Sequence, residues 1–408
     1  MTSDSTHRPP RIALFGKFGV QNIGNECTLA AMLDNLRAYR LGGDLFCVCS
    51  EPSDTTCRHN IPAVRIEAVT HRPGAKRSLL RLMLVRFPAE VRGWLSALRT
   101  LRGTDALIMT GTGMLTDSGE SPLGFPYEIF KWACVARCSG CKVRFVAVGV
   151  GPMRRRLTRM FIHGALRLSD YRSYRDAASR RRLQDQGAHI DHDAVLPDLA
   201  FSLRPDRLSA HHRADGSRRF IGVGIMDNYG PPDTRIRRTL FFDNYIEKTA
   251  AFVAWLLQQN YAVRILYGDL SCDAEPRLRL RRALVRQGVQ YDDQRVSGSD
   301  IRTEDDLLRQ LSATDIVVSP RYHNLVLAMM LNKPVIALSY DYKNEALLTE
   351  AGLGEYWQRI EELDVSKLIE QFQHAERNSL EIRRLLQRLV PEYRRRWESE
   401  YPRVFANL

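Results

Sequence analysis

Residues 11–26 read RIALFGKFGVQNIGNE, which is an apolar run, a glycine-containing loop and the start of a helical pattern. The apolar run at Arg11–Phe15 is typical of a buried strand, and the pattern from about Glu26 to Tyr39 is typical of a helix. Short apolar runs alternate with longer helical patterns along most of the chain. This alternation predicts β–α units with parallel sheets, and therefore the α/β class.

The β–α pattern is interrupted between Ser202 and Arg219, where Pro, Asp, Gly, Ser and His dominate, as in a linker. A chain of 408 residues is long enough for two domains. We therefore predict two doubly wound, Rossmann-like domains facing a cleft. The predicted parts are an N-terminal domain over 1–205 with Gly-rich loops and basic helices, a linker over 206–218, a C-terminal domain over 219–385, and an Arg-rich helix over 386–408 that is broken or kinked at Pro391.

The composition excludes several classes of protein. With 44% hydrophobic and 26% charged residues, the chain is globular and not disordered. The longest uncharged run, Thr249–Val263, is shorter than the roughly 20 residues of a membrane-spanning helix. The first ten residues lack the apolar segment of a signal peptide, and the 8 cysteines are too few for a disulfide framework. We expect a cytoplasmic protein.

The charge balance favours anionic partners. The chain has 60 basic and 47 acidic residues, and nearly all of the cations are Arg, which binds phosphates, acidic sugars and anionic lipid. No basic helix carries base-reading side chains, so we expect no nucleic acid partner. The segment Arg77–Arg102 mixes many Arg with Leu, Met, Phe and Trp94, as an interfacial helix does. It predicts peripheral contact with an anionic membrane surface; the alternative is a helical pair, interrupted at Pro88, that packs on the sheet.

Ligands of doubly wound sheets bind at the loops that follow the carboxyl ends of strands. In the loop over 16–26, glycines beside a helix N-terminus would let backbone N–H groups point at an anion, so we select Asn22, Gly24 and Asn25. The loop is neither a Walker A sequence nor G-x-G-x-x-G. The alternative is a turn that needs glycine only for a positive φ.

Small residues also lie in or after further strands. Gly111, Thr112 and Gly113 follow a strand and would let a ligand approach the backbone. Gly224 lies in the expected strand Phe220–Ile225, which opens the second half, and could belong to a nucleotide clamp. The cluster of arginines over 154–159 is expected to form a solvated face.

Charged side chains lie in further expected loops. Arg175 belongs to the expected loop Tyr171–Asp176, directly before the expected helix N-cap Asp176. There it would stand at a loop mouth and could fork a phosphate or carboxylate. In SPRYHN (319–324), Arg321 could hold an anion and His323 could transfer a proton near neutral pH. The alternative is a histidine that caps its own helix. Lys343 follows the strand PVIAL, and its alternative role is surface solvation.

In their order, these motifs resemble the polysaccharide pyruvyl transferase family. The resemblance covers Arg11 to about Gly352. It rests on N-x-G-[ND]-E at 22–26, G-x-G-x-L-x-D at 111–117, G-V-G-P at 149–152, S-x-R-D at 173–176, P-D-x-A-F at 197–201, R-x-H at 321–323 and Y-D-x-K at 340–343. It implies a two-domain GT-B-like fold. It also implies transfer of the enolpyruvyl unit of phosphoenolpyruvate to hydroxyls of a saccharide or glycolipid, usually as a ketal.

By that resemblance, Arg321 and Arg175 would hold the carboxylate and phosphate of the donor, with one guanidinium from each lobe, and His323 would transfer protons. The expected catalytic residues are His323 and Arg321. The expected donor- or substrate-binding residues are Arg175, Asn22, Gly24, Asn25, Gly111, Thr112, Gly113, Gly224, Asn324 and Lys343. The resemblance requires phosphoenolpyruvate as co-substrate and no metal or redox cofactor.

The sequence departs from the family pattern at three positions. It has Asn25 where Asp is common, Thr112 within what is often a triple glycine, and Asn324 where a small residue often follows the histidine. The first removes a charge from the loop, and the other two narrow the expected cleft. We therefore expect these three changes to affect which acceptor is bound more than which donor is bound.

Three other functions stay open at this point. The first is a glycosyltransferase with a sugar-nucleotide donor, which would share the fold. The second is a radical enzyme, because Cys134, Cys138 and Cys141 have the spacing of an iron–sulfur site; we expect these cysteines to be small core residues instead. The third is a non-catalytic saccharide-binding relative, against which the Arg321/His323 pair argues.

Overall fold

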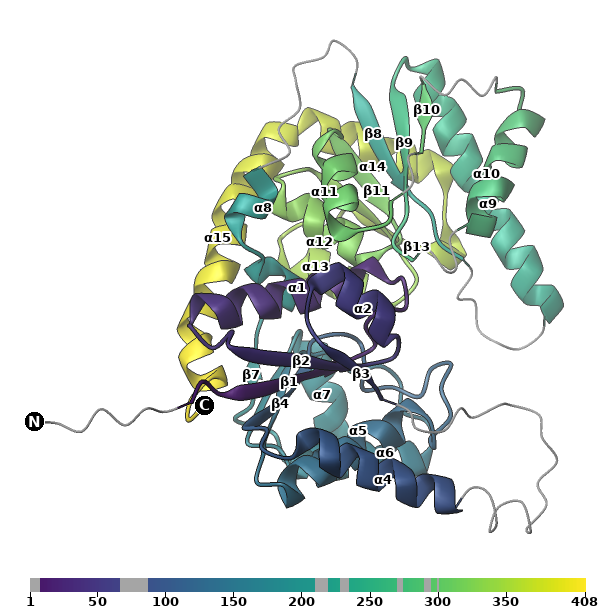
Figure 1. Cartoon of the computed structure of the whole chain (residues 1–408). Coiled ribbons are helices and arrows are strands. Elements are labelled where there is room, and N and C mark those ends of the chain that lie inside the picture. The colour runs from purple at the N-terminus through teal and green to yellow at the C-terminus, as the bar shows by residue number, and fades with distance from the viewer. Residues whose placement is uncertain are drawn as a thin grey trace, which may run out of the picture. The chain divides into compact units, whose positions relative to one another are not determined.

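The computed structural model describes residues 8–66, 87–209, 219–227, 235–269, 274–289, 295–298 and 301–408 (Figure 1). The chain forms two compact units. Unit 1 comprises Met1–Val20, Thr28–Leu199 and Arg396–Leu408, and unit 2 comprises Gln21–Cys27 and Ala200–Arg395. Residues 21–27 and 200–205 belong to unit 2, although the predicted N-terminal domain covers both segments.

Unit 1 is built on a parallel sheet of seven described strands in the order β3-β2-β1-β4-β5-β6-β7. The strands are β1 (Arg11–Gly16), β2 (Asp44–Cys49), β3 (Ala63–Arg65), β4 (Ala106–Thr110), β5 (Lys142–Val148), β6 (Tyr171–Tyr174) and β7 (Ala194–Val195). The chain winds outward from β1 in both directions, which is the doubly wound order. The central strands are apolar throughout because helices cover both faces.

Helices of unit 1 cover the two faces of this sheet in two groups. They are α1 (Ile23–Ala38), α2 (Pro52–His59), α4 (Phe87–Leu101), α5 (Phe125–Cys138), α6 (Arg156–Arg167) and α7 (Ala177–Asp185). In Figure 1, α4, α5 and α6 lie on one face and α1 and α2 on the other. Phe15 stacks on Phe125 with ring centroids 5.7 Å apart, which ties the central strand to α5.

Unit 2 has a second parallel sheet, with six described strands in the order β10-β9-β8-β11-β12-β13. The strands are β8 (Phe220–Gly224), β9 (Ala262–Leu266), β10 (Val296–Ser297), β11 (Ile316–Ser319), β12 (Val335–Ser339) and β13 (Trp357–Arg359). The helices are α8 (Pro205–Ser209), α9 (Arg235–Gln258), α10 (Ala274–Arg286), α11 (Glu304–Ser312), α12 (Tyr322–Met330), α13 (Tyr342–Glu350), α14 (Val365–Arg377) and α15 (Ser379–Val404), with short 3-10 turns at Leu199–Ser202 and Ile360–Glu362. The predicted α/β class is confirmed in both units.

Two local predictions were wrong. The segment Tyr171–Tyr174, read as a loop, is strand β6; its polar sequence is accommodated because Arg172 pairs with Asp193 at 2.7 Å. The predicted break at Pro391 does not occur, since α15 continues across it. Trp397 lies further along the same helix, is fully buried and donates to the carbonyl of Pro197, so tertiary packing outweighs the local effect of proline.

Part of two other predictions lies outside the described residues. Of the predicted linker, 206–209 belong to α8 and 210–218 are not described. Of the predicted amphipathic segment Arg77–Arg102, the described part begins with α4.

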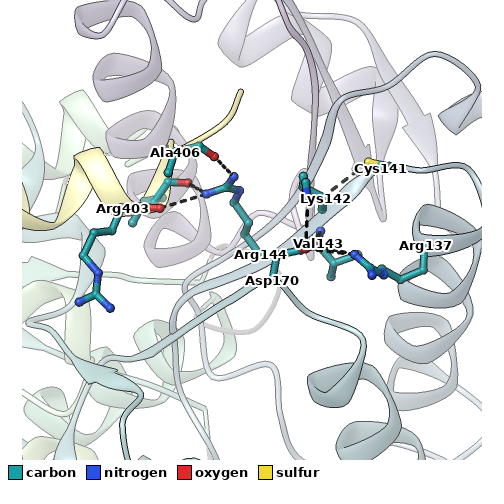
Figure 2. Close-up of polar contacts among 9 residues, drawn as sticks. Arg137, Cys141, Lys142, Val143, Arg144, Asp170, Arg403 and Ala406 are labelled. Carbon is teal, nitrogen blue, oxygen red and sulfur yellow. Dashed lines mark hydrogen bonds and ion pairs between the residues drawn. The ribbon is translucent and has the colours of Figure 1, made fainter.

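The end of α15 is held in unit 1 by a buried arginine of the sheet. Arg144 in β5 is 4% exposed. It donates to the carbonyl of Arg403 at 3.1 Å and to those of Val404 and Ala406 (Figure 2). Carbonyls at a helix C-terminus have no partner within the helix, and here the guanidinium supplies one. Of the tail predicted as a separate helix over 386–408, residues 396–408 therefore belong to the fold of unit 1.

A second polar cluster lies beside it, around Asp170 (Figure 2). The carboxylate of Asp170 accepts from the backbone N–H of Val143 at 2.9 Å and from Arg137 at 3.0 Å, and Lys142 lies 3.5 Å away. Burial alone would raise the pKa of Asp170, but this N–H group and the two cations outweigh burial and hold it below the ordinary value.

We expect Asp170→Asn to destabilise the protein by about 1–3 kcal/mol at pH 7, because the hydrogen bonds to a charged acceptor are lost. The folded-state pKa of Asp170 is lowered, so its contribution is present above the unfolded-state pKa and disappears as pH falls through the folded-state pKa. Urea unfolding of both proteins at pH 7 and pH 3 measures the difference.

The matched control is Asp44→Asn, whose carboxylate lies 3.5 Å from Arg11 and is 54% exposed. An exposed pair of this kind should change stability little. An Asp170→Asn difference that is equally large at pH 3 would contradict the assignment.

Candidate functional site

The R-x-H motif of unit 2 lies at the end of β11, against glycines of neighbouring loops. Arg321 is the N-cap residue of α12 and is 7% exposed. Its backbone N–H donates to Ser319 Oγ at 3.1 Å. A Cβ at Gly268 would lie 3.0 Å from Cδ of Arg321, and a Cβ at Gly224 would lie 2.6 Å from Cβ of Ser319. The two glycines leave the space that this buried loop occupies.

His323 is half-buried and packs against the first turn of α1. A Cβ at Gly24 would lie 2.5 Å from Cε1 and 2.6 Å from Cγ of the imidazole, which is too close for any larger residue. Gly24 does not have a positive φ, unlike Gly19 in the same loop. Gly24 is therefore needed for close approach of His323, and the alternative that its glycine serves only turn conformation is wrong.

Asn22 and the loop after β9 hold this first turn of α1 in unit 2. The side chain Oδ1 of Asn22 accepts from the N–H of Asn25 at 3.3 Å, as an N-cap residue does, and its Nδ2 donates to Asp269 at 3.2 Å. The N–H of Ile23 donates to the carbonyl of Gly268 at 3.0 Å. These contacts explain why Gln21–Cys27 belong to unit 2, and they use both ends of the Asn22 amide that we expected to contact a ligand.

Gly268 and Asp269 were missed by the sequence analysis. Gly268 contacts Arg321, and Asp269 holds Asn22, so both residues position the predicted catalytic pair. The available signal was a Gly-Asp dipeptide directly after the apolar strand Ala262–Leu266.

Two buried asparagines lie close to the R-x-H motif in the chain and in the fold. Asn344 of α13 is fully buried and donates to the carbonyl of Pro320 at 2.8 Å, which fixes the loop that carries Arg321. Asn324, in the first turn of α12, is also fully buried, and its Nδ2 and Oδ1 have no hydrogen-bond partner in the described part of the chain. Asn344 was not predicted, and Asn324 was.

Lys343 lies in the first turn of α13. Its Nζ lies 4.6 Å from the centroid of the Tyr340 ring, a cation–π distance. Its predicted ligand role stays a prediction.

In unit 1, Arg175 follows β6 and is packed on a glycine in the same manner. It is 7% exposed, and a Cβ at Gly149 would lie 2.5 Å from its Nε. A Cβ at Gly113 would lie 3.6 Å from its Nη2. Two carboxylates face the guanidinium, with Asp176 at 3.4 Å and Asp198 at 3.9 Å. Asp176 also caps α7 by accepting from Ser179, as predicted.

A β-bulge shapes the strand end next to Arg175. The pairing of β5 with β6 shifts between Phe145 and Val148, and Ala147 has a φ of +48°. The N–H of Ala147 donates to Ser173 Oγ at 2.9 Å. A Cβ at Gly111 would lie 2.7 Å from the carbonyl oxygen of Ala147, so Gly111 makes room for the bulge. Non-glycine residues with positive φ are strained and cluster at functional sites.

The loops after β4 and β5 are hydrogen-bonded to each other. Gly149 donates to the carbonyl of Thr112 at 2.8 Å, Leu115 donates to that of Gly149 at 3.2 Å, and Gly151 donates to that of Leu115 at 3.0 Å. These N–H groups are used within the protein. Thr112 is 6% exposed, so its hydroxyl-bearing side chain is packed in this pair of loops.

The predicted residues thus fall into two groups, each within its own unit. The group in unit 2 contains Asn22, Gly24, Asn25, Gly224, Arg321, His323, Asn324 and Lys343, and the group in unit 1 contains Gly111, Thr112, Gly113 and Arg175. Several glycines have a packing role in each group, while the ligand roles stay predictions.

The three cysteines of the iron–sulfur spacing do not gather into a thiolate site. Cys134 is half-buried, Cys138 is exposed and Cys141 is buried. Burial, with Asp105 and Asp170 nearby, raises the pKa of the Cys141 thiol to about 12, which opposes the thiolate that a cluster needs. Across the described ranges, no group of three or more His, Cys, Asp or Glu side chains could hold a metal ion.

Solved structures of similar fold include proteins described as an epimerase and as a glycosyltransferase. A protein described as a UDP-N-acetylglucosamine 2-epimerase from Listeria monocytogenes matches with a TM-score of 0.63 and 11% identity over 98% of each chain. MurG from Acinetobacter baumannii matches with a TM-score of 0.51 and 12% identity over 95% of each chain. A glycosyltransferase from Rickettsia africae matches with a TM-score of 0.55 and 11% identity over 98% of this chain and 100% of that chain. At these identities the matches show the fold, which is GT-B-like.

The family is shown by the sequence itself. A family model described as polysaccharide pyruvyl transferase matches residues 22–342. The chain belongs to this family, and it is therefore a transferase enzyme of polysaccharide biosynthesis with a saccharide acceptor. A search of curated proteins gave no match. Among the described helices, none has both the length and the apolar character needed to cross a bilayer.

We expect Gly24→Ala to lower turnover at least tenfold with a loss of about 1–3 kcal/mol in stability, because the added methyl group displaces the His323 ring. The control is Gly354→Ala, where the new Cβ would have only ordinary contacts, the nearest at 3.7 Å. Steady-state rates and urea unfolding measure both variants. Wild-type turnover in Gly24→Ala would show that the ring position is unimportant.

We expect Asn324→Leu to leave the stability of the protein unchanged or raised, because burial of an amide without a protein partner costs about 1–3 kcal/mol of folding free energy. We also expect the variant to have a lower turnover. Asn344→Leu is the matched control, since it removes a hydrogen bond of the same buried amide type and should destabilise the protein. Equal losses of stability in both variants, measured by denaturant unfolding, would contradict the prediction that the Asn324 amide does not stabilise the fold.

Proposed function

We propose that this enzyme transfers the enolpyruvyl group of phosphoenolpyruvate to hydroxyls of a saccharide and forms a pyruvate ketal. The observation that carries the proposal is the pairing of Arg321 and His323 at the end of β11, with each side chain packed against a glycine. The family membership supports the same reaction class.

The guanidinium of Arg321 suits the donor. Phosphoenolpyruvate is small and carries a carboxylate and a phosphate, and Arg forks onto the planar oxygens of such groups. Arg321 is 7% exposed, and a cation with few water contacts attracts an anion more strongly than one in bulk solvent.

His323 supplies the proton chemistry. The attacking hydroxyl oxygen bonds to the carbon that bears the phosphate, a proton is added to the methylene carbon, and inorganic phosphate leaves. A second hydroxyl of the acceptor then closes the ketal. An imidazole can take the hydroxyl proton and deliver a proton to carbon in turn. The contact with Gly24 fixes the plane of the ring for these transfers.

Asn324 gives independent support for a ligand near this pair. It is fully buried three residues after Arg321, and its side chain has no hydrogen-bond partner in the described part of the protein. Buried amides of this kind are rare unless they serve a ligand or a bound water.

The role of Arg175 in holding the donor stays a prediction. Its positive charge is partly compensated by Asp176 and Asp198, which weakens its attraction for an anion. The proposal also includes a lipid-linked form of the acceptor and peripheral association with an anionic membrane.

We expect Arg321→Ala to weaken phosphoenolpyruvate binding about 10- to 100-fold, because a charge-assisted contact is lost. His323→Ala should keep donor affinity and lower turnover by about 10²- to 10⁴-fold. Calorimetry with phosphoenolpyruvate measures the first effect, and release of inorganic phosphate with an acceptor mixture measures the second.

The control variants are Arg309→Ala, a cation that is 61% exposed, and His192→Ala, an exposed histidine. Both should behave as the wild type does. Tighter binding of UDP-sugars than of phosphoenolpyruvate would favour the sugar-nucleotide alternative, and phosphate release at the wild-type rate in His323→Ala would reject the assignment.

A further inference from the structure

Exposed apolar side chains gather on one helical layer of unit 1. Ten large apolar residues are exposed in the described part of the chain, and six of them lie on α4, on α6 or in the loop before α5. The six are Val91, Leu95, Leu98, Leu123, Leu157 and Met160. Such gathering differs from the scattered exposure that is normal on soluble proteins.

On α4 the exposed residues form one stripe. Val91, Leu95 and Leu98 are spaced four and three residues apart, so they share a face of the helix, and their exposed fractions are 41%, 44% and 39%. The buried side of α4 is formed by Ala97 and Leu101. The stripe is therefore not needed to attach α4 to the sheet.

The stripe continues onto α6 by way of α5. Tyr127 of α5 accepts from Trp94 of α4 at 2.9 Å, and its ring lies 5.3 Å from that of Phe161 in α6. The three helices form one layer in Figure 1. On α6, Leu157 is 38% exposed and Met160 is 58% exposed, so apolar groups stand at both edges of this layer.

Arginines surround these apolar residues with almost no opposing charge. Residues 88–102 and 154–167 contain Arg92, Arg99, Arg102, Arg154, Arg155, Arg156, Arg159 and Arg167, and their one acidic residue is Glu90. Glu90 already accepts from Tyr127 at 2.7 Å and lies 3.6 Å from Lys131. Arg92 and Arg99 of α4 form no ion pair within the described ranges.

Helix α10 of unit 2 is a basic helix that can be compared with α4 and α6. It also exposes Leu278 and Val285, at 51% and 59%. Two of its five arginines are compensated, because Arg279 pairs with Asp243 and Glu275, and Arg286 pairs with Glu247. Within the described ranges, the layer of unit 1 gathers more of the exposed apolar residues, and Arg92 and Arg99 beside them form no ion pair.

We propose that this α4–α6 surface, defined by Val91, Leu95, Leu98, Leu157, Met160 and the arginines beside them, binds the surface of a membrane that contains anionic lipid. This inference rests on the peripheral membrane association included in the proposed function and assigns it to a surface. Apolar side chains enter the headgroup region while guanidinium groups bind lipid phosphates, which is how interfacial helices attach. Each Arg near an anionic surface contributes about fivefold in binding.

Vesicle flotation tests the proposal with the full chain at low salt. Wild type should float with vesicles of phosphatidylcholine and phosphatidylglycerol, float poorly with phosphatidylcholine alone, and lose binding at about 0.5 M salt. The double variants Leu95→Ser/Met160→Ser and Arg92→Gln/Arg99→Gln should each lower the partition coefficient more than tenfold. The matched control Leu278→Ser/Val285→Ser on α10 should bind as wild type does.

Urea unfolding and calorimetry with phosphoenolpyruvate accompany each variant, so a folding defect or a lost donor site is recognised separately from lost membrane binding. The proposal is overturned if wild type does not float, if it floats equally on both lipid compositions, or if the α10 control loses as much binding as the α4–α6 variants. It is also overturned if light scattering shows that the α4–α6 variants break up a dimer and no vesicle binding exists.

Discussion

The arrangement of both candidate groups depends on one packing constraint: charged or titratable side chains at strand ends lie directly on glycines. Gly24 faces His323, Gly268 faces Arg321, and Gly149 faces Arg175. The contacts at Gly24 and Gly149 are too close for a Cβ, and a Cβ at Gly268 would be crowded at 3.0 Å from Arg321. Each of these glycines is therefore required by its partner and not by its own backbone conformation, since none of the three has a positive φ. A guanidinium held in this way loses rotamer freedom when the protein folds and not when a ligand arrives, which is the pre-organisation that anion recognition requires.

The same constraint explains what could and could not be predicted from the sequence. The strand and helix periodicity of the central elements is strong, so the α/β class and the positions of Arg321 and His323 at the end of a strand followed directly. Gly24 was selected as an anion-loop residue, whereas its neighbour is an imidazole nearly 300 positions away; no local pattern carries such a contact. Asp269 and Asn344 were missed for the same reason, since each acts on a residue of another loop. Strand β6 was missed because its polar sequence is stabilised by Asp193, which lies outside it.

The two arginines are held by different contacts, although both lie on glycines. Arg175 has two carboxylates within 4 Å, which fix the guanidinium and moderate its attraction for an anion. Arg321 packs the stem of its side chain near Gly268, and its backbone N–H donates to a serine hydroxyl. Each unit therefore positions its own arginine through contacts within that unit.

The segments that the two units exchange have a consequence for dissection of the enzyme. The buried guanidinium of Arg144 donates to carbonyls of Arg403, Val404 and Ala406, which lie more than half the length of the sequence further along the chain. Expression of the first half alone would leave that cation desolvated inside the sheet, and deletion of residues 403–406 would do the same. The nascent N-terminal half therefore cannot complete its native hydrogen bonding until residues 403–406 have been synthesised, so native folding of unit 1 waits for a segment that follows the whole of unit 2.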